Sequence, residues 1–205
     1  MSVSSWLVAR PWAYNVTQRL AGLEIIKRRV APILAATAGK TVLDVGAGTA
    51  LYLTVLPQAA RYVWLDNDPQ KLRGFQGPVI GKRRAVIGDA VNLGLRDRSV
   101  DCVLCLHLTH HLDDTELARL VDELARVVRQ TLIFQDAVKT RRLASRLLWR
   151  WDRGSHPRDA ESLMAALRTR FEIERAERYS TLHEYLLIVA VPRRVVSAGL
   201  KPCST

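Results

Sequence analysis

The stretch TVLDVGAGT, residues 41–49, decides the fold. Its first half is apolar and β-branched around a single acid, as in a buried strand, and glycines follow at positions 46 and 48. Glycine permits the tight turn that leads from a strand into a helix, and without a Cβ it lets a ligand approach the backbone closely. A Gly-x-Gly pair alone is weak evidence, because any strand-to-helix turn can carry one. The stretch predicts a strand, a glycine turn and a helix that begins near Thr49.

Outward from this stretch, short apolar runs alternate with segments of helical pattern. The runs that predict strands are residues 41–45, 62–65, 85–87, 100–106, 131–134, 171–177 and 183–191. The segments that predict helices are residues 18–36, 49–56, 69–73 and 113–129. In the last of these, apolar residues recur at helical spacing, acids open the segment and arginines close it. The alternation indicates an α/β domain with a mostly parallel sheet, whose ligands bind at the carboxyl ends of the strands.

Acidic residues stand at the expected ends of three strands. Asp44 lies directly before the glycines, where a carboxylate disfavours a pyrophosphate and attracts a cationic group. A dinucleotide site would need a third glycine where the sequence has Leu51. Asp66 follows Gly46 by 20 residues, the separation at which an acid meets the ribose hydroxyls in a doubly wound fold. Asp89 is placed to accept the exocyclic amine of adenine. A cationic head, a ribose and an adenine are the parts of S-adenosylmethionine.

In their order and spacing, these motifs resemble the class I S-adenosylmethionine-dependent methyltransferases. The stretches that carry the resemblance are Leu43–Thr49, Val63–Pro69, Gly88–Ala90 and Asp101–Leu112. They are most similar to the branch that includes small-molecule, quinone and lipid methyltransferases. The resemblance implies a Rossmann-like, doubly wound α/β sheet of seven strands, mostly parallel, with helices on both faces. Its antiparallel last strand would be residues 183–191.

The resemblance also implies which residues hold the cofactor. The glycine loop would hold the methionine part, Asp66 the ribose and Asp89–Ala90 the adenine, while Tyr14 of the N-terminal segment would close over the site. The full set of expected cofactor contacts is Tyr14, Asp44, Gly46, Ala47, Gly48, Asp66, Asn67, Asp89, Ala90 and Leu106. The sequence departs from the family pattern in two places. Ala50 replaces a common third glycine, which a helix start should tolerate, and a short link at 129–131 replaces a Pro-Gly-Gly turn.

Three histidines cluster at the end of the fourth expected strand, where the methyl group should be delivered. A histidine there can act as a general base. The alternative is structural, because His110–His111 occurs in this family as a turn before the next helix. We name His107 and His111 as the candidate catalytic residues. A base is needed only if the acceptor must lose a proton, since orientation alone supplies much of the rate of an in-line displacement.

The charge of the chain is unusual and unevenly placed. Its 31 Lys and Arg against 20 Asp and Glu give a net charge of +11. Residues 41–140 are neutral overall, so the whole excess lies in residues 1–40 and 141–205. These ends are expected to cover the substrate: Trp149 and Trp151 stand among arginines, and Arg153 or Arg158 could hold a substrate carboxylate or phosphate. Such a segment can also lie on an anionic membrane surface, or simply pack on the domain with its arginines in solvent.

One domain accounts for the whole chain. Its expected parts are an N-terminal helical cap (1–40), a cofactor-binding core (41–136), a lid-like insertion (137–170), the last two strands (171–191) and a flexible tail (192–205). The three cysteines form no disulfide pattern and no zinc-ligand set, and no secretory signal is visible, so we expect a cytoplasmic protein without a metal site.

The sequence therefore predicts an S-adenosylmethionine-dependent methyltransferase. The acceptor would be a small molecule of aromatic, lipid-like or anionic character, methylated on O, N or C. Two alternatives stay open: an RNA methyltransferase, suggested by the charge, and a non-catalytic scaffold that binds the cofactor. We expect a small-molecule substrate rather than nucleic acid, peripheral contact with an anionic membrane as a secondary partner, and a monomer or homodimer.

Overall fold

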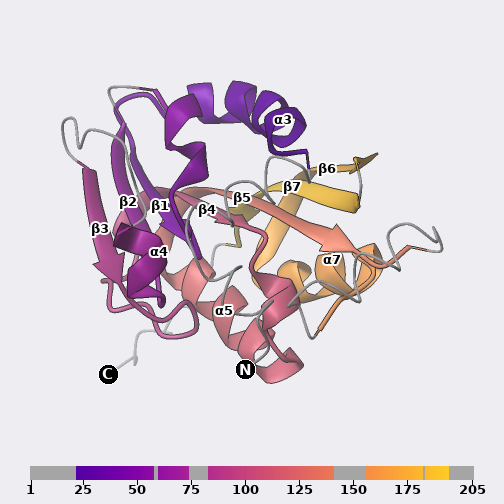
Figure 1. The fold of residues 1–205 in the computed structure, drawn as a ribbon. Coiled ribbons are helices and arrows are strands. Elements are labelled where there is room, and N and C mark those ends of the chain that lie inside the picture. The colour runs from indigo at the N-terminus through magenta and orange to yellow at the C-terminus, as the bar shows by residue number, and fades with distance from the viewer. Residues whose placement is uncertain (1–21, 58–59, 74–82, 141–155, 182, 194–205) are drawn as a thin grey trace, which may run out of the picture.

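A seven-stranded sheet runs through the middle of the molecule in the order β3-β2-β1-β4-β5-β7-β6 (Figure 1). The computed structural model describes residues 22–57, 60–73, 83–140, 156–181 and 183–193. The strands are β1 (Thr41–Val45), β2 (Arg61–Asp66), β3 (Arg83–Ile87), β4 (Val100–Leu106), β5 (Val128–Val138), β6 (Phe171–Ser180) and β7 (Glu184–Pro192). All seven overlap with the predicted apolar runs, although β2, β3, β5 and β6 are longer than predicted.

The direction of the strands confirms the expected topology. Strands β1 to β5 pair in parallel, and β7 lies antiparallel between β5 and β6. The chain enters the sheet at β1, proceeds outward through β2 and β3, and then crosses back to β4 on the other side of β1. The carboxyl ends of β1 and β4 therefore form the topological switch point, where ligands bind in sheets of this kind.

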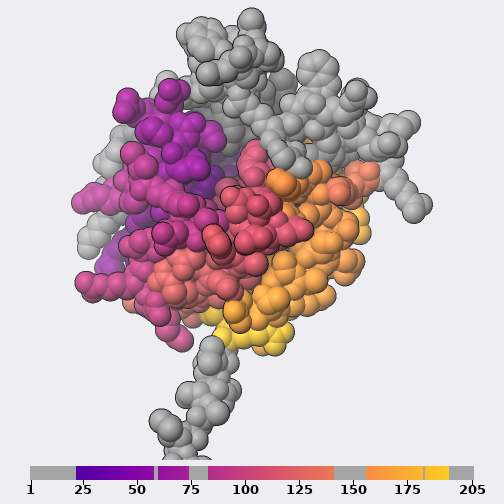
Figure 2. Space-filling model, turned by 90° about the horizontal axis from the view of Figure 1, so that it is seen from below, coloured from indigo at the N-terminus to yellow at the C-terminus, as the bar shows by residue number. Residues whose placement is uncertain are grey.

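Helices cover both faces of the sheet. On one face lie α3 (Leu23–Ala35), the 3₁₀ helix η1 (Leu51–Val55) and α4 (Pro69–Arg73). On the other lie α5 (Asp114–Val127) and α7 (Ala160–Arg168), which stand next to each other in the view of Figure 2. Each face buries its own apolar cluster. Because successive residues of a strand point to opposite faces, Val42 and Asp44 point toward α3 while Leu43 and Val45 point toward α5.

The helix α5 begins as its sequence predicts. Asp113 caps it: its carboxylate accepts the Glu116 amide at 2.8 Å, and the Glu116 carboxylate accepts the Asp113 amide at 2.9 Å. The predicted end at 129 is wrong, because the helix stops at Val127 and Val128 already has an extended backbone. Strand β5 follows directly, so the short link expected at 129–131 is instead part of this strand.

The segment after the glycines is shorter and tighter than predicted. A helix was expected over 49–56, and the structure has only the 3₁₀ turn η1 at Leu51–Val55. Ala50, the residue before it, is left-handed with φ 56° and ψ 45°. A left-handed conformation costs an L-residue roughly 1–2 kcal/mol, so Ala50 does not simply start a helix as expected but is held in a strained turn.

Candidate functional site

A small hollow opens at the carboxyl ends of β1 and β4, at the switch point of the sheet. The residues that line it are Asp44, Gly46, Ala47, Leu51, Tyr52, Leu106 and His107. Five of the seven were candidate site residues from the sequence. Leu51 and Tyr52 were not, because the 3₁₀ turn that brings them to the hollow replaces the predicted α-helix.

The glycine loop is held by the neighbouring strand β2. The amides of Gly46 and Ala47 both donate to the Leu65 carbonyl, at 2.8 and 3.0 Å. Gly46 and Gly48 have φ values of 71° and 55°, which favour glycine. A Cβ on Gly46 would also come within 2.9 Å of the Leu108 side chain. The first glycine is thus required by the backbone and by the space around it.

Replacing Gly46 with alanine should lower the free energy of unfolding by about 1–3 kcal/mol, because the left-handed backbone penalises a Cβ and Leu108 must shift. Urea unfolding of three glycine variants separates these causes. Gly39→Ala, at φ 74° with no atom within 4 Å, measures the backbone penalty alone. Gly94 has neither a left-handed backbone nor an atom within 4 Å of its Cβ position, so Gly94→Ala should leave the free energy of unfolding unchanged or raise it slightly. Equal effects at positions 46 and 39 would contradict the clash with Leu108.

Asp44 places a buried carboxyl group at the floor of the hollow. Its side chain is only 1% exposed and accepts a hydrogen bond from the Tyr62 hydroxyl. Burial raises the pKa of Asp44 to about 7; the bond from Tyr62 opposes this rise, and the nearby Asp66 adds to it. A carboxyl group with this pKa titrates near neutrality, and a cationic ligand beside it would favour its charged form.

Asp66 links the end of β2 to the glycine loop. Its carboxylate is 5% exposed, and its two oxygens accept the Gly48 amide at 2.8 Å and the Asp68 amide at 2.9 Å. Each carboxylate oxygen has two acceptor positions, so both can still accept a ribose hydroxyl. Asp68 caps α4 by accepting the Gln70 amide at 2.8 Å. Asn67, next to Asp66, is exposed.

The expected adenine residues lie at the end of β3. Asp89 is exposed, and its carboxylate accepts the Val91 amide at 3.0 Å, while Ala90 is half-buried against the core on the α5 face. The Gly88 amide donates to the Asp66 carbonyl at 3.1 Å, which joins the end of β3 to the end of β2. These residues do not line the small hollow, but they continue the same edge of the sheet.

His107 stands at the end of β4 and lines the hollow. It is left-handed with φ 58°, its amide donates to the Gln135 carbonyl at 2.9 Å, and its Nε2 lies 3.0 Å from the Gln135 side-chain nitrogen. Its ring makes an edge contact with Tyr185, with centroids 5.3 Å apart. The sequence analysis missed Gln135, although an amide within the apolar run of β5 is a signal that it could have used.

His110 is a structural residue. It lies in the turn η2 (Thr109–His111), where the structural alternative expects a turn before the next helix. Its Nδ1 is 2.6 Å from the carboxylate of Asp136, which is fully buried. His111 is exposed, with its ring centroid 4.1 Å from that of His110. His111 is therefore not among the described residues that line the hollow, whereas His107 is.

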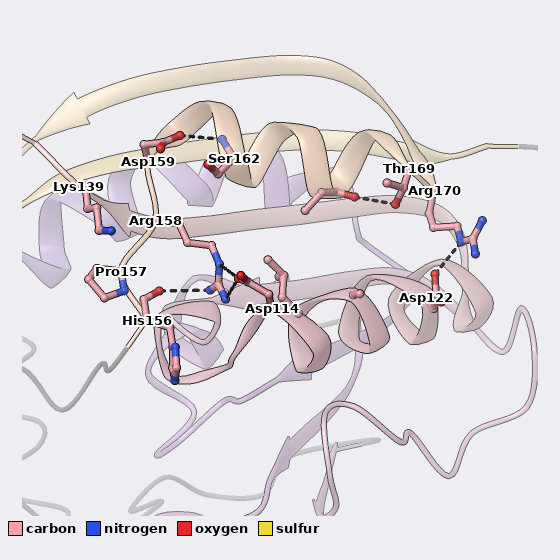
Figure 3. Close-up of a pocket in the computed structure, with 13 residues that line it drawn as sticks. Asp114, Asp122, Lys139, His156, Pro157, Arg158, Asp159, Ser162, Thr169 and Arg170 are labelled. Carbon is pink, nitrogen blue, oxygen red and sulfur yellow. Dashed lines mark hydrogen bonds and ion pairs between the residues drawn. The ribbon is translucent and has the colours of Figure 1, made fainter.

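Arg158 holds the loop that follows β4. Its guanidinium donates to the Asp114 carboxylate at 2.7 Å (Figure 3). It also donates to the carbonyls of Thr109 and Leu112, at 2.8 Å each. Arg158 borders a groove of about 760 Å³ between α5 and α7, on the face of the sheet opposite Asp44. Its contacts assign it to the architecture, not to the substrate carboxylate or phosphate suggested by the sequence.

Several candidates lie outside the described residues. They are Tyr14, the tryptophans of the two ends and Arg153. Most of the expected cap and tail also lies outside these ranges, apart from the part of the cap that contains α3 and the end of β7. Within the described ranges, no helix is long and apolar enough to cross a membrane.

The described residues fit S-adenosylmethionine. A buried carboxyl group suits its ammonium, a second carboxylate in acceptor geometry suits its ribose, and the Gly46–Ala47 turn lines the hollow where its methionine part would lie. In the part of the chain that the structure describes, no cluster of three or more His, Cys, Asp or Glu could hold a metal ion.

Comparisons with known proteins agree with this geometry. Residues 43–134 match the family described as a methyltransferase domain. A magnesium protoporphyrin IX methyltransferase from Synechocystis, solved with bound S-adenosylhomocysteine, is 21% identical, with a TM-score of 0.70 and 84% of each chain covered. An S-adenosylmethionine-dependent methyltransferase from Aquifex aeolicus is 18% identical, with a TM-score of 0.64 over 82% of this chain and 89% of that one.

The PH0226 protein from Pyrococcus horikoshii is also 18% identical, with a TM-score of 0.67 over 80% of this chain and 88% of that one. The comparison with curated proteins found no match. The matched domain, the order of the sheet and the glycine loop with its acids lead to one conclusion: residues 43–134 match a methyltransferase domain, and the chain has the fold of the S-adenosylmethionine-dependent methyltransferases to which it is similar.

Proposed function

We propose that this methyltransferase acts on a small-molecule acceptor of aromatic, lipid-like or anionic character, and that His107 lies beside the reacting atoms. The hollow at the switch point carries this proposal. It combines a buried acid and a glycine for the cofactor with apolar side chains and a histidine for an acceptor.

The cofactor supplies an activated methyl group on a sulfonium. The residues of this chain would do the rest by binding and orienting. Asp44 would meet the ammonium, Asp66 the two ribose hydroxyls and Asp89 the adenine amine. Gly46 and Ala47, which line the hollow beside Asp44, would contact the methionine part. Orientation of this kind contributes much of the rate of an in-line displacement.

The two basic ends would complete the pocket as a cap and a lid over the substrate. This accounts for the placement of the net charge outside residues 41–140. A basic cover suits an anionic acceptor, because opposite charges attract across a site shielded from water.

The proposal is tested by methyl transfer from cofactor with a labelled methyl group into a cell extract divided into small-molecule and RNA fractions. We expect label in the small-molecule fraction. Asp66→Ala should weaken cofactor binding by about 1–3 kcal/mol, because it removes acceptors of the ribose hydroxyls, and labelling should fall with it. Calorimetry measures the binding directly.

Asp68→Ser is the matched control, because serine can still cap α4 and should leave cofactor affinity unchanged. Label in RNA, with binding that weakens steeply as salt is added, would show that the acceptor is RNA. Cofactor binding without transfer to either fraction would identify a non-catalytic scaffold.

A further inference from the structure

A chain of polar side chains lies behind His107, away from the cofactor residues. Gln135 on β5 is fully buried, and its side-chain oxygen Oε1 accepts the hydroxyl of Tyr179 at 2.5 Å. Its side-chain nitrogen lies 3.0 Å from Nε2 of His107. Tyr179 lies on β6, two strands away, and stacks on Tyr185 with ring centroids 5.5 Å apart. Three strands thus contribute to one hydrogen-bonded line that ends at the hollow.

The tyrosine fixes the orientation of the amide. Burial raises the pKa of Tyr179, although the nearby Arg29 opposes this, so its hydroxyl keeps its proton and can donate. In the structure the oxygen of Gln135 accepts from this hydroxyl, and the amide nitrogen faces His107. A side-chain amide nitrogen only donates hydrogen bonds. The two nitrogens can form a bond only if Nε2 of His107 carries no proton and offers its lone pair.

We propose that Gln135 is a positioning residue that holds His107 as the neutral tautomer protonated at Nδ1, so that the ring does not act as the base during methyl transfer. This inference rests on the proposed function, which places His107 beside the reacting atoms. A protonated ring would set an Nε2–H donor against the amide donor. The other neutral tautomer, with its proton on Nε2, would also place two hydrogen-bond donors face to face.

The assignment narrows the class of acceptor. With Nε2 engaged by Gln135, the site favours an acceptor atom that has no proton to lose, and a carboxylate is the common case at neutral pH. A carboxylate oxygen would form the new O–C bond with its own electron pair, while the C–S bond breaks and its pair stays on sulfur. The products are a neutral ester and a neutral thioether, and no proton moves.

Nitrogen NMR of the histidine rings tests the tautomer without any substrate. The sequence has five histidines, and a His107→Gln variant identifies the signal of His107. In the wild type at neutral pH we expect a protonated Nδ1 and an unprotonated Nε2. Gln135→Glu replaces the amide donor with an acceptor of similar shape, so a proton should appear on Nε2.

Gln130→Glu is the matched control, since Gln130 is exposed on the same strand and should leave the His107 signal unchanged. Tyr179→Phe is the milder variant if a buried glutamate in place of Gln135 prevents folding: it frees the amide to turn, and Nε2 should become partly protonated. A wild-type ring protonated on Nε2, or a signal unchanged in both variants, would overturn the proposal.

The acceptor class is tested separately on the labelled product. A carboxylate methyl ester releases its label in mild alkali, whereas methyl ethers and methylamines keep it. Label that resists alkali would overturn the carboxylate assignment even if the tautomer is as expected. Absence of any labelled small molecule would instead contradict the proposed function, so the failures are distinguishable.

Discussion

Replacing Asp136 with alanine should lower the free energy of unfolding by about 3–5 kcal/mol, the usual loss when one partner of a buried polar pair is removed. Asp136 is 0% exposed at the end of β5. One of its oxygens accepts the amide and the hydroxyl of Thr109, at 2.7 and 2.6 Å, and the other lies 2.6 Å from Nδ1 of His110. The amide of Ala137 also donates to it, at 2.8 Å. Alanine would leave several buried donors without an acceptor.

Urea unfolding measures this loss, and thermal unfolding should show a fall in Tm of roughly 10 °C for a chain of this length. Asp122→Ala is the matched control. Asp122 forms an ion pair with Arg170 at 2.6 Å, but both side chains are more than half exposed. Exposed pairs contribute about 0–1 kcal/mol. Similar losses at positions 136 and 122 would contradict the importance of the buried network.

The pH dependence of the free energy of unfolding provides a second test of the role of Asp136. Burial alone would raise the pKa of its carboxyl group, but the charge of His110 and the hydrogen bonds from His110 and Thr109 hold it below the ordinary value of 3.8. A group with a depressed pKa in the folded state contributes fully above its unfolded value and loses this contribution as pH falls. The wild type should therefore lose stability below about pH 4 more steeply than Asp136→Asn, which has no carboxyl group at this position.

Much of the fold follows from local patterns in the sequence. The strands could be predicted because each is a short apolar run that ends at a glycine, an acid or a turn. Asp44 and Gly46 could be placed because both belong to one continuous stretch, so their proximity needs no knowledge of the tertiary structure. The antiparallel direction of β7 came only from the resemblance to a family, since apolar periodicity says nothing about strand direction.

Other features depend on contacts between distant segments. Gln135 and Tyr179 are 44 residues apart and meet only because β7 sits between β5 and β6 and aligns them. Arg158 resembles a free anion-binding arginine in the sequence, and only the structure shows that it binds the carbonyls of Thr109 and Leu112. The left-handed turn at Ala50 is imposed by the loop around it, because alanine itself prefers a helix.

The affinity for S-adenosylmethionine should depend on pH through Asp44. Burial raises the pKa of this carboxyl group to about 7, against the bond from Tyr62 and with the added repulsion of Asp66. Only the ionised group attracts the ammonium of the ligand. Below about pH 7, each unit should therefore weaken the contribution of Asp44 to binding up to tenfold, until the neutral carboxyl group contributes little.

The measurement is the ratio of cofactor affinities of the wild type and Asp44→Asn, obtained by calorimetry over about pH 5–8. Both proteins meet the same ligand, so the titration of the ligand's own amine cancels in the ratio. We expect a ratio near one at about pH 5, rising to about 10–100 by pH 8, as for the loss of a hydrogen bond to a charged group. A ratio that does not change with pH would remove Asp44 from the ammonium site.

Tyr62→Phe sharpens the assignment, because it keeps the ring that stacks on Trp64 and removes only the hydroxyl that favours ionised Asp44. The midpoint of the affinity ratio should then move to higher pH.

The stability of the unliganded protein should change with pH in the opposite sense to its cofactor binding. A buried acid with a raised pKa stabilises the folded state below its unfolded value and loses this contribution as pH rises to about 7. At about pH 8 the unliganded Asp44→Asn protein should therefore be more stable than the wild type while binding the cofactor more weakly. Such a result would identify the buried charge of Asp44 as one kept for binding at the expense of stability.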